Sequence, residues 1–281
     1  MIVQGGIIHR DRIALAYTAV VSDTPQLVLI VVHGLSEHKG RYLRLQHDLA
    51  GAAPLADGGY AVYAYDQRGF GKSGGPRTHV NRYTDYLLDL RAVIAFVRGL
   101  HPEAKIVIMG HSLGGLVAAT FCATYPNGVH GLVLSAPAYE VPPLPVPLRL
   151  LAFLLQFLMP NLPAKYPNDP EQLSHDPEVV AAFRNDPLVQ SAATPRFYAE
   201  FLKMNRYLHK NADRICLPTL LLQGGKDQIV IPQGAKALLH KIQSAQKEIF
   251  WYDGFLHEPF NEMGRERVIS DLIGWLKATF I

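Results

Sequence analysis

The chain has 281 residues, of which 49% are hydrophobic, so it is long and apolar enough to bury a full-sized core. Charged residues make up 18% and the net charge is only +3, which excludes the basic surface that a nucleic-acid partner requires. The two cysteines, Cys122 and Cys216, have no metal-ligand spacing, so we expect two buried thiols rather than a disulfide or a metal site.

The first predicted element is an antiparallel hairpin, because residues 6–20 (GIIHRDRIALAYTAV) hold two apolar runs around a charged turn. That turn, Arg10 to Arg12, also interrupts any apolar stretch at the N-terminus, so a secretory signal peptide is not evident. We therefore expect a cytoplasmic protein.

Six apolar runs rich in β-branched residues follow the hairpin, with helical patterns between them. The runs are continuous rather than alternating, which predicts strands buried on both faces of a mostly parallel sheet. With the hairpin they make an α/β fold of about eight strands flanked by helices, and ligands bind such sheets at the carboxyl ends of the strands. The runs are QLVLIVVHG (26–34), YAVYAYD (60–66), KIVIMGH (105–111), GLVLSAP (131–137), PTLLLQGG (218–225) and KEIFWYD (247–253), and the helical patterns cover 83–100, 113–125, 234–242 and 265–280.

Residues 138–214 break this rhythm and predict an inserted helical cap, which divides the core into residues 1–137 and 215–281. The insertion holds the apolar stretch 148–159, whose 12 positions include Arg149 and Gln156. A membrane-spanning helix needs about 20 apolar residues, so this stretch is too short to cross a bilayer. It is either a core helix or a lid that covers a pocket and touches lipid, and its place between two sheet strands favours the lid.

The candidate nucleophile is Ser112 in Gly110-His111-Ser112-Leu113-Gly114, between a predicted strand and a predicted helix. Glycines at 110 and 114 suit a sharp turn in which the backbone comes too close for a Cβ atom. A serine that only caps the helix would explain the hydroxyl but not the two glycines.

A serine nucleophile needs a base, and the base needs an acid that orients it. His257, in the loop after the last predicted strand, is the candidate base, and Asp227, directly after the preceding strand, is the candidate acid. Asp253 is the rival acid, but it belongs to the end of the strand that leads to His257, and its reach to the imidazole is less natural. The chain order Ser, Asp, His is that of the α/β-hydrolase arrangement.

Backbone N–H groups of Leu113 and Leu35 are the candidate oxyanion donors, because Leu113 starts a helix and Leu35 follows the turn at the end of a buried strand. His33 and His111 are interpreted as residues that shape these loops rather than as bases. Eight further histidines are expected at the surface: His9, His47, His79, His101, His130, His175, His209 and His240.

The stretch 69–74 spells G-x-G-x-x-G and contains Gly-Lys-Ser, but Gly75-Pro76 follows where a helix should open. Asp66 also occupies the place of the leading glycine of a phosphate-binding loop. The stretch is therefore interpreted as a glycine-rich loop at the sheet edge, and neither a nucleotide nor any other cofactor is expected.

Five stretches in this order resemble the monoacylglycerol lipase and lysophospholipase branch of the α/β-hydrolases: HGLSEHKGRY, YDQRGFGKSGG, GHSLGG, LLLQGGKDQIV and HEPF. The resemblance covers nearly the whole chain. It implies a triad of Ser112, Asp227 and His257, oxyanion donors at Leu35 and Leu113, a mobile apolar cap between the sixth and seventh strands, and single-chain lipid esters as substrates. Glu37 and Arg41 fall where the family places charges near the pocket mouth, where they fix loop geometry or contact a glycerol head.

The sequence thus predicts a cofactor-independent serine hydrolase that cleaves monoacylglycerol to free fatty acid and glycerol through an acyl-enzyme on Ser112. Alternatives on the same triad are a lysophospholipase, a short-chain or medium-chain carboxylesterase, a thioesterase and a proline-type aminopeptidase. A ligand-binding receptor on the same fold is the alternative without catalysis. We also expect a transient contact between the cap and a membrane surface, which would make the protein peripheral.

Overall fold

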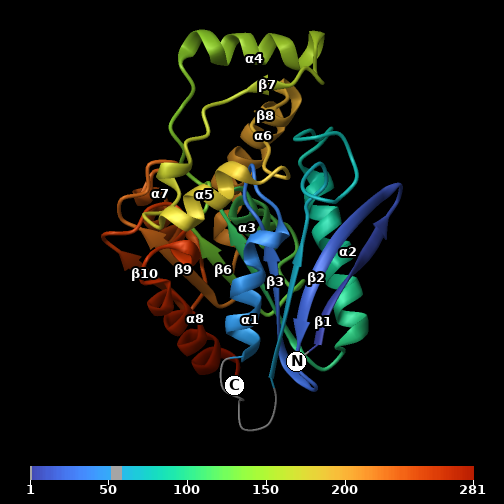
Figure 1. The fold of residues 1–281 in the computed structure, drawn as a ribbon, viewed down its shortest axis with the longest axis vertical. Helices are drawn as coiled ribbons and strands as arrows, with labels where there is room; N and C mark the ends of the chain where they lie inside the picture. Colours follow the sequence, from blue (N-terminus) through green and yellow to red (C-terminus); the bar gives the residue numbers. More distant parts are fainter. Residues whose placement is uncertain (1, 52–58) are drawn as a thin grey trace.

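A computed structural model describes residues 2–51 and 59–281 and has a central eight-stranded sheet in the order β1-β2-β4-β3-β5-β6-β9-β10 (Figure 1). Antiparallel pairing joins β1 to β2 and β2 to β4, and the remaining pairs are parallel. The predicted hairpin and all six predicted strand runs are therefore confirmed. The strands are β1 Ile2–Arg10, β2 Ile13–Val21, β3 Pro25–Val32, β4 Gly59–Tyr65, β5 Lys105–His111, β6 Gly131–Ser135, β9 Thr219–Gly224 and β10 Lys247–Tyr252.

Helices cover both faces of the sheet, as continuous apolar strands require. One face packs against α1 (Leu43–Gly51) and α8 (Arg265–Phe280), whose buried side chains share one core cluster. The other face packs against α2 (Thr84–Leu100), α3 (Leu113–Thr124) and α7 (Pro232–Lys241) in a second, larger cluster. The sequence did not predict α1.

The insertion between β6 and β9 has two parts that pack differently. Its first helix, α4, lies at the top of the molecule in Figure 1, whereas its last helix, α6, buries Phe197, Met204 and Leu208 in the same core cluster as α3. The division into a core and a cap of residues 138–214 stays a prediction, because α6 shares the main core. The elements of the insertion are α4 Val146–Leu158, β7 Ala164–Lys165, η2 Pro170–Gln172, α5 Pro177–Asn185, β8 Ala192–Ala193, α6 Pro195–Asn211 and η3 Ala212–Arg214.

Two minor predictions from the sequence are wrong. The Cys216 thiol is exposed rather than buried, whereas Cys122 is buried as expected. His79 is buried rather than at the surface, because its ring packs under the start of α6, with Nδ1 3.0 Å from the hydroxyl oxygen of Thr194. The burial of His79 depends on tertiary packing against the insertion, which local sequence does not reveal.

Candidate active site

Ser112 lies in a strained turn between β5 and α3. Its φ of 51° and ψ of −116° fall in a region that side chains other than glycine rarely adopt. The backbone around it is held on both sides, because Ser112 N–H donates to Ser135 O at 3.0 Å and Ser112 O accepts from Ala138 N–H at 3.0 Å. Strain kept in place by its surroundings is typical of the sharp turn that presents a nucleophilic serine.

The flanking glycines are required by close backbone approach. A Cβ atom on Gly110 would lie 2.3 Å from the carbonyl oxygen of Gly114, and one on Gly114 would lie 2.0 Å from the carbonyl oxygen of Val32. Neither clash can be relieved by moving a side chain, since both partners are backbone atoms. The packing of α3 directly over β3 and β5 therefore depends on these two residues.

His257 and Asp227 meet at the carboxyl edge of β9 and β10. The imidazole Nδ1 of His257 lies 2.8 Å from Oδ2 of Asp227, and both side chains are buried. An ionised carboxylate can only accept hydrogen bonds, so Nδ1 carries the proton and Nε2 keeps its lone pair. Asp253, the rival acid, is exposed at the turn after β10.

The surroundings of Asp227 keep it ionised. Burial alone would raise the pKa of Asp227, but the charge and hydrogen bond of His257 and the N–H groups of Val230 and Ile229 outweigh burial and lower it. Conversely, burial would lower the pKa of His257, but the charge and hydrogen bond of Asp227, with smaller contributions from Glu258 and Glu37, raise it.

The loop after β3 and the loop after β10 both reach the Ser112 turn. The ring centroids of His111 and His257 are 4.8 Å apart, which brings the imidazole of His257 against the residue that precedes Ser112. A Cβ atom built on Gly34 would lie 3.1 Å from Cβ of Ser112, so the β3 loop (residues 33–38) touches the serine from another side. The structure thus brings together the serine turn, the imidazole of His257 and Gly34, the residue before Leu35.

His33 fixes the direction of the peptide between Gly34 and Leu35. Its Nε2 accepts from Gln67 N–H at 2.9 Å, so Nδ1 is the protonated nitrogen and donates to Gly34 O at 2.8 Å. Burial lowers the pKa of His33 and favours this neutral form. In a planar trans peptide the Leu35 N–H points opposite to the Gly34 carbonyl, so holding the carbonyl also aims the N–H. This agrees with the interpretation of His33 as a loop-shaping residue.

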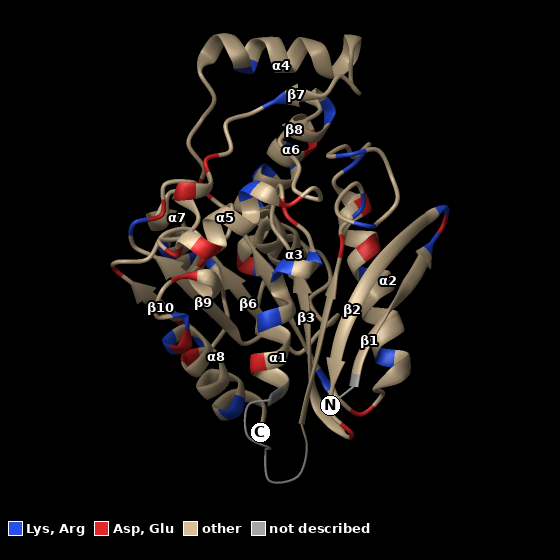
Figure 2. Ribbon diagram, viewed as in Figure 1, with Lys and Arg blue, Asp and Glu red and all other residues tan. Residues whose placement is uncertain are grey.

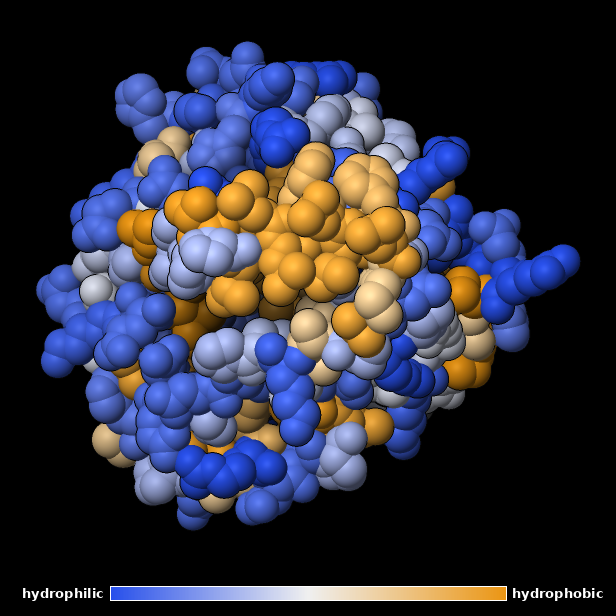
Figure 3. All heavy atoms as spheres, turned by 90° about the horizontal axis from the view of Figure 1, so that it is seen from above, coloured by the Kyte–Doolittle hydropathy of each residue, from blue (hydrophilic) through white to orange (hydrophobic). Residues whose placement is uncertain are grey.

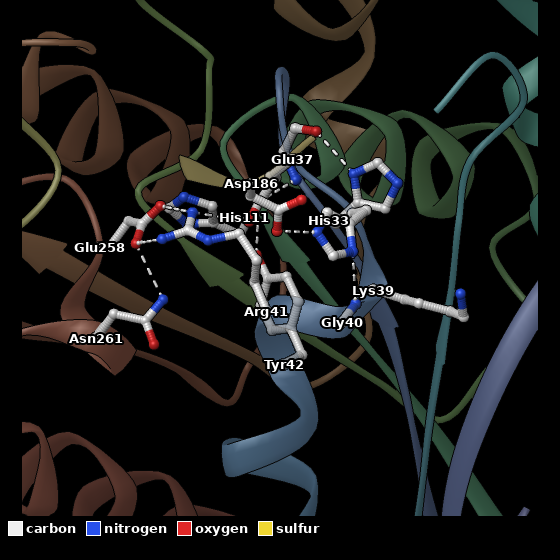
Figure 4. Close-up of polar contacts among 12 residues, drawn as sticks. His33, Glu37, Lys39, Gly40, Arg41, Tyr42, His111, Asp186, Glu258 and Asn261 are labelled. Atoms are coloured by element: carbon white, nitrogen blue, oxygen red, sulfur yellow. Dashed lines mark hydrogen bonds and ion pairs between the residues drawn. The ribbon is translucent and has the colours of Figure 1, made fainter. Parts of the chain in front are cut away.

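Arg41 lies between two buried carboxylates, as Figure 4 shows. Its guanidinium forms a bidentate pair with Glu258, with Nη2 2.8 Å from Oε2, and its Nη1 is 3.4 Å from Oε2 of Glu37. Glu37 in turn accepts from Gly34 N–H and, at 2.8 Å, from Tyr42 O–H. Side-chain exposures are only 9% for Arg41, 3% for Glu37 and 5% for Glu258, so this Arg41 cluster (Glu37, Arg41 and Glu258) holds loops together.

The insertion also contacts both loops. From the β3 loop, His38 Nε2 lies 2.7 Å from Oδ2 of Asp186, and the Ser36 hydroxyl pairs with the Tyr166 hydroxyl. In the β10 loop (residues 253–258), the Glu258 N–H donates to Leu173 O at 2.9 Å. Residues 166–190 therefore form part of the wall of the site.

Sequence reasoning missed Glu258, His38 and Asp186. The HEPF stretch carried a signal for Glu258, since a charge next to the candidate base stood out in an apolar loop. No local signal pointed to Asp186, which is 148 residues from its partner His38.

The glycine-rich stretch 69–74 wraps a carboxylate instead of a phosphate. Asp66 accepts from Lys72 N–H at 2.8 Å, from Lys39 N–H at 2.7 Å and from Lys39 Nζ at 2.8 Å. A Cβ atom on Gly71 would lie 2.4 Å from the Asp66 carboxyl group, which explains the glycine there. An acidic side chain at the centre of the loop disfavours an anionic ligand.

The class of protein follows from this geometry. A strained serine between a central parallel strand and a helix, with a buried Asp–His pair supplied by the last two strands of the same sheet, is the arrangement of the α/β-hydrolases.

Comparisons with known proteins narrow the class. The family model for serine aminopeptidase, S33, matches residues 23–264. A monoacylglycerol lipase of Mycolicibacterium smegmatis is 31% identical over 94% of this chain and 93% of its own, and the monoglyceride lipase of Mus musculus is 30% identical over 91% of this chain and 84% of its own. The crystal structure of Paleococcus ferrophilus monoacylglycerol lipase matches with a TM-score of 0.84 and 32% identity, covering 94% of this chain and 99% of that chain.

The chain therefore belongs to the serine aminopeptidase S33 family of α/β-hydrolases, in its monoacylglycerol lipase branch. The family resemblance, the fold class and the class of enzyme, a serine ester hydrolase, are confirmed as predicted from the sequence.

Proposed function

We propose that the protein hydrolyses monoacylglycerols to a free fatty acid and glycerol, with Ser112, His257 and Asp227 as the catalytic triad. The observation that carries this proposal is the buried pair of His257 and Asp227, joined at 2.8 Å beside the strained Ser112 turn. The names of the Mycolicibacterium smegmatis and Mus musculus relatives support the choice of ester.

In the first half of the reaction, Ser112 Oγ attacks the ester carbonyl while Nε2 of His257 takes the hydroxyl proton. Asp227 holds Nδ1–H and stabilises the imidazolium that forms. The imidazolium then protonates the leaving glycerol oxygen, which leaves an acyl-enzyme on Ser112. In the second half, His257 takes a proton from a water as the water oxygen attacks the acyl carbon. The imidazolium then returns the proton to Ser112 Oγ as the acyl–oxygen bond breaks and the fatty acid leaves.

The oxyanion formed in both halves needs donors placed in advance. We propose the N–H groups of Leu113, at the N-terminus of α3, and of Leu35, whose direction follows from the Gly34 carbonyl held by His33. Losing one such donor costs about 3 kcal/mol of transition-state stabilisation in studied enzymes. No metal or cofactor takes part in the proposed steps.

A substrate panel tests the proposal. Initial rates should be compared for a long-chain monoacylglycerol, a lysophosphatidylcholine with the same acyl chain, p-nitrophenyl butyrate and a prolyl amide. We expect the highest kcat/KM for the monoacylglycerol, the ester named for the two relatives. A higher kcat/KM for the lysophospholipid, the short ester or the prolyl amide would replace the proposed substrate with that one, while leaving the triad in place.

We also propose that α4 makes a transient contact with a membrane surface. Of the thirteen residues of α4, all of which the structure describes, only Gln156 is buried, while Phe157 and Leu158 are 64% and 76% exposed. The helix therefore turns a polar residue inward and apolar ones outward, the reverse of a helix packed on a core. Figure 3 shows these apolar side chains as one continuous patch on the face seen from above.

The charge around this patch suits an anionic lipid surface. Between Glu140 and Asp169 the chain has no carboxylate, and its charged residues there are Arg149 and Lys165 (Figure 2). Arg149 lies within α4 and Lys165 follows it, and an amphipathic helix that carries cations binds in the plane of a lipid interface. Across residues 2–51 and 59–281, no helix is both long and apolar enough to cross a bilayer.

Replacing Leu154 and Phe157 by serine should weaken binding to vesicles of phosphatidylcholine and phosphatidylglycerol. Burying one such side chain is worth about 1.5–3 kcal/mol, so we expect at least a roughly tenfold lower partition coefficient in flotation. The matched control replaces Leu100 and Met263, which are 50% and 60% exposed elsewhere on the surface, by serine. Unchanged flotation of the Leu154→Ser, Phe157→Ser variant would refute the contact through α4.

A further inference from the structure

The Arg41 cluster joins the three segments that surround the Ser112 turn. Glu37 belongs to the β3 loop, Glu258 directly follows His257 in the β10 loop, and the Phe183 ring of α5 stacks on the Arg41 guanidinium at 4.8 Å. The sequence left open whether Glu37 and Arg41 contact a glycerol head or fix loops. Side-chain exposures of 9% or less and the pairing within the set favour a role in fixing loops over contact with a glycerol head.

Each end of the cluster acts on a different part of the site. At one end, Glu37 accepts a hydrogen bond from Gly34 N–H, while His33 donates one to Gly34 O. Both backbone polar groups of Gly34 are therefore held. At the other end, the bidentate pair with Arg41 and the amide of Asn261, 2.9 Å from Oε2, fix the side chain of Glu258. The two ends are coupled because one guanidinium serves both carboxylates.

We propose that Arg41 is a positioning residue that keeps the Leu35 donor and the His257 base in register, by tying the β3 loop to the β10 loop through Glu37 and Glu258. This inference rests on the proposed triad and oxyanion donors. Arginine suits the role because its planar fork binds one carboxylate through two hydrogen bonds and still reaches a second. Lysine offers a point charge without that fork.

The cluster also sets the charge that His257 experiences. The groups facing the imidazole are Asp227, Glu258 and Glu37, which raise its pKa, and His111, whose own pKa is lowered by burial and by His257. Arg41 lowers the pKa of Glu258 against the effect of burial, so this carboxylate stays charged. Removing the Glu258 charge should therefore lower the pKa of His257 and move the acid limb of kcat/KM to lower pH.

The test compares Arg41→Lys, Glu258→Gln and the control Arg68→Lys. Arg68 forms an equally short bidentate pair with Asp89, with contacts of 2.5 and 2.6 Å, but this pair ties a loop to α2. The main readout is the second-order rate of Ser112 labelling by a fluorophosphonate, which depends on the base and the oxyanion donors but not on lipid binding.

For Arg41→Lys we expect labelling and kcat to fall about ten- to hundredfold with KM within about twofold, because small misplacements of reacting groups cost this much. For Glu258→Gln we also expect slower labelling and a lower kcat. In addition, the acid limb of its kcat/KM profile should lie at lower pH than that of the wild type. Arg68→Lys should lose thermal stability, but its labelling rate and the pH of its acid limb should match those of the wild type.

Folded Arg41→Lys that labels within twofold of wild type would overturn the proposal. If that variant does not fold, Glu258→Gln provides the test. An acid limb at the wild-type pH together with wild-type labelling would overturn the proposal. An acid limb at lower pH together with slower labelling would support it. Rapid labelling of the wild type at Ser112 shows separately that the proposed triad functions.

Discussion

Replacing Ser112 by alanine should lower turnover of a monoacylglycerol by about six orders of magnitude, the loss seen when the nucleophile of a studied serine protease is removed. Alanine has the same Cβ as serine and tolerates φ 51° no better and no worse, so the turn should keep its strain and the protein its stability. Only the attacking oxygen is lost, and substrate binding should persist.

The measurement is single-turnover hydrolysis beside fluorophosphonate labelling, with Ser244→Ala as the matched control. Ser244 is also buried, but its hydroxyl donates to Gln246 O in a turn before β10. Labelled wild type and an unlabelled Ser112→Ala variant would exclude the receptor alternative. Residual turnover above about 1% of wild type would mean that another group attacks the ester.

The strand pattern and the serine turn could be predicted from the sequence because both leave local traces. Continuous apolar runs such as residues 26–34 occur where a strand is covered on both faces. A Cβ atom added to Gly110 or Gly114 would lie 2.3 or 2.0 Å from a backbone oxygen, so only glycine fits at these two positions. Helix α1 lacked such a trace, since its buried side chains include the polar Gln46 beside Leu45 and Leu49, and its mean hydropathy is close to neutral.

Contacts between distant segments could not be predicted. Arg41 and Glu258 are 217 residues apart, and nothing in either local sequence specifies the partner. Their pairing depends on the parallel arrangement of β3, β5, β6, β9 and β10, which places the carboxyl ends of β3 and β10 on the same side of the sheet. The packing of α6 in the main core was missed for the same reason. The sequence of α6 contains the apolar residues, but it does not specify that they pack in the core cluster that contains α3.

Two parts of the insertion, segment 166–190 and helix α4, have different roles in the proposed reaction. Segment 166–190 hydrogen-bonds to both the β3 loop and the β10 loop, so we expect it to stay in place during turnover. Helix α4 exposes its apolar side chains and is free to meet a lipid surface. Motion that admits substrate should thus be confined to α4 and its flanking segments, while the geometry of Ser112 and His257 is kept.

Replacing Asp227 by asparagine should lower kcat by about four orders of magnitude, by forcing the wrong tautomer of His257. Oδ1 of Asp227 accepts from the N–H groups of Ile229 at 2.9 Å and Val230 at 3.0 Å. An asparagine keeps its oxygen on these two donors and must turn its NH2 group to Nδ1 of His257. The imidazole then accepts at Nδ1 and carries its proton on Nε2, where it cannot take one from Ser112.

The matched control is Asp253→Asn, because Asp253 is the rival acid and differs from Asp227 in being exposed. We expect this variant to keep wild-type kcat and KM. Asp227→Asn should also lose most of the interaction that raises the pKa of His257, so its residual activity should have an acid limb at lower pH than wild type. A large loss in Asp253→Asn, with Asp227→Asn near wild type, would transfer the orienting role to Asp253 and require the β10 loop to rearrange during turnover.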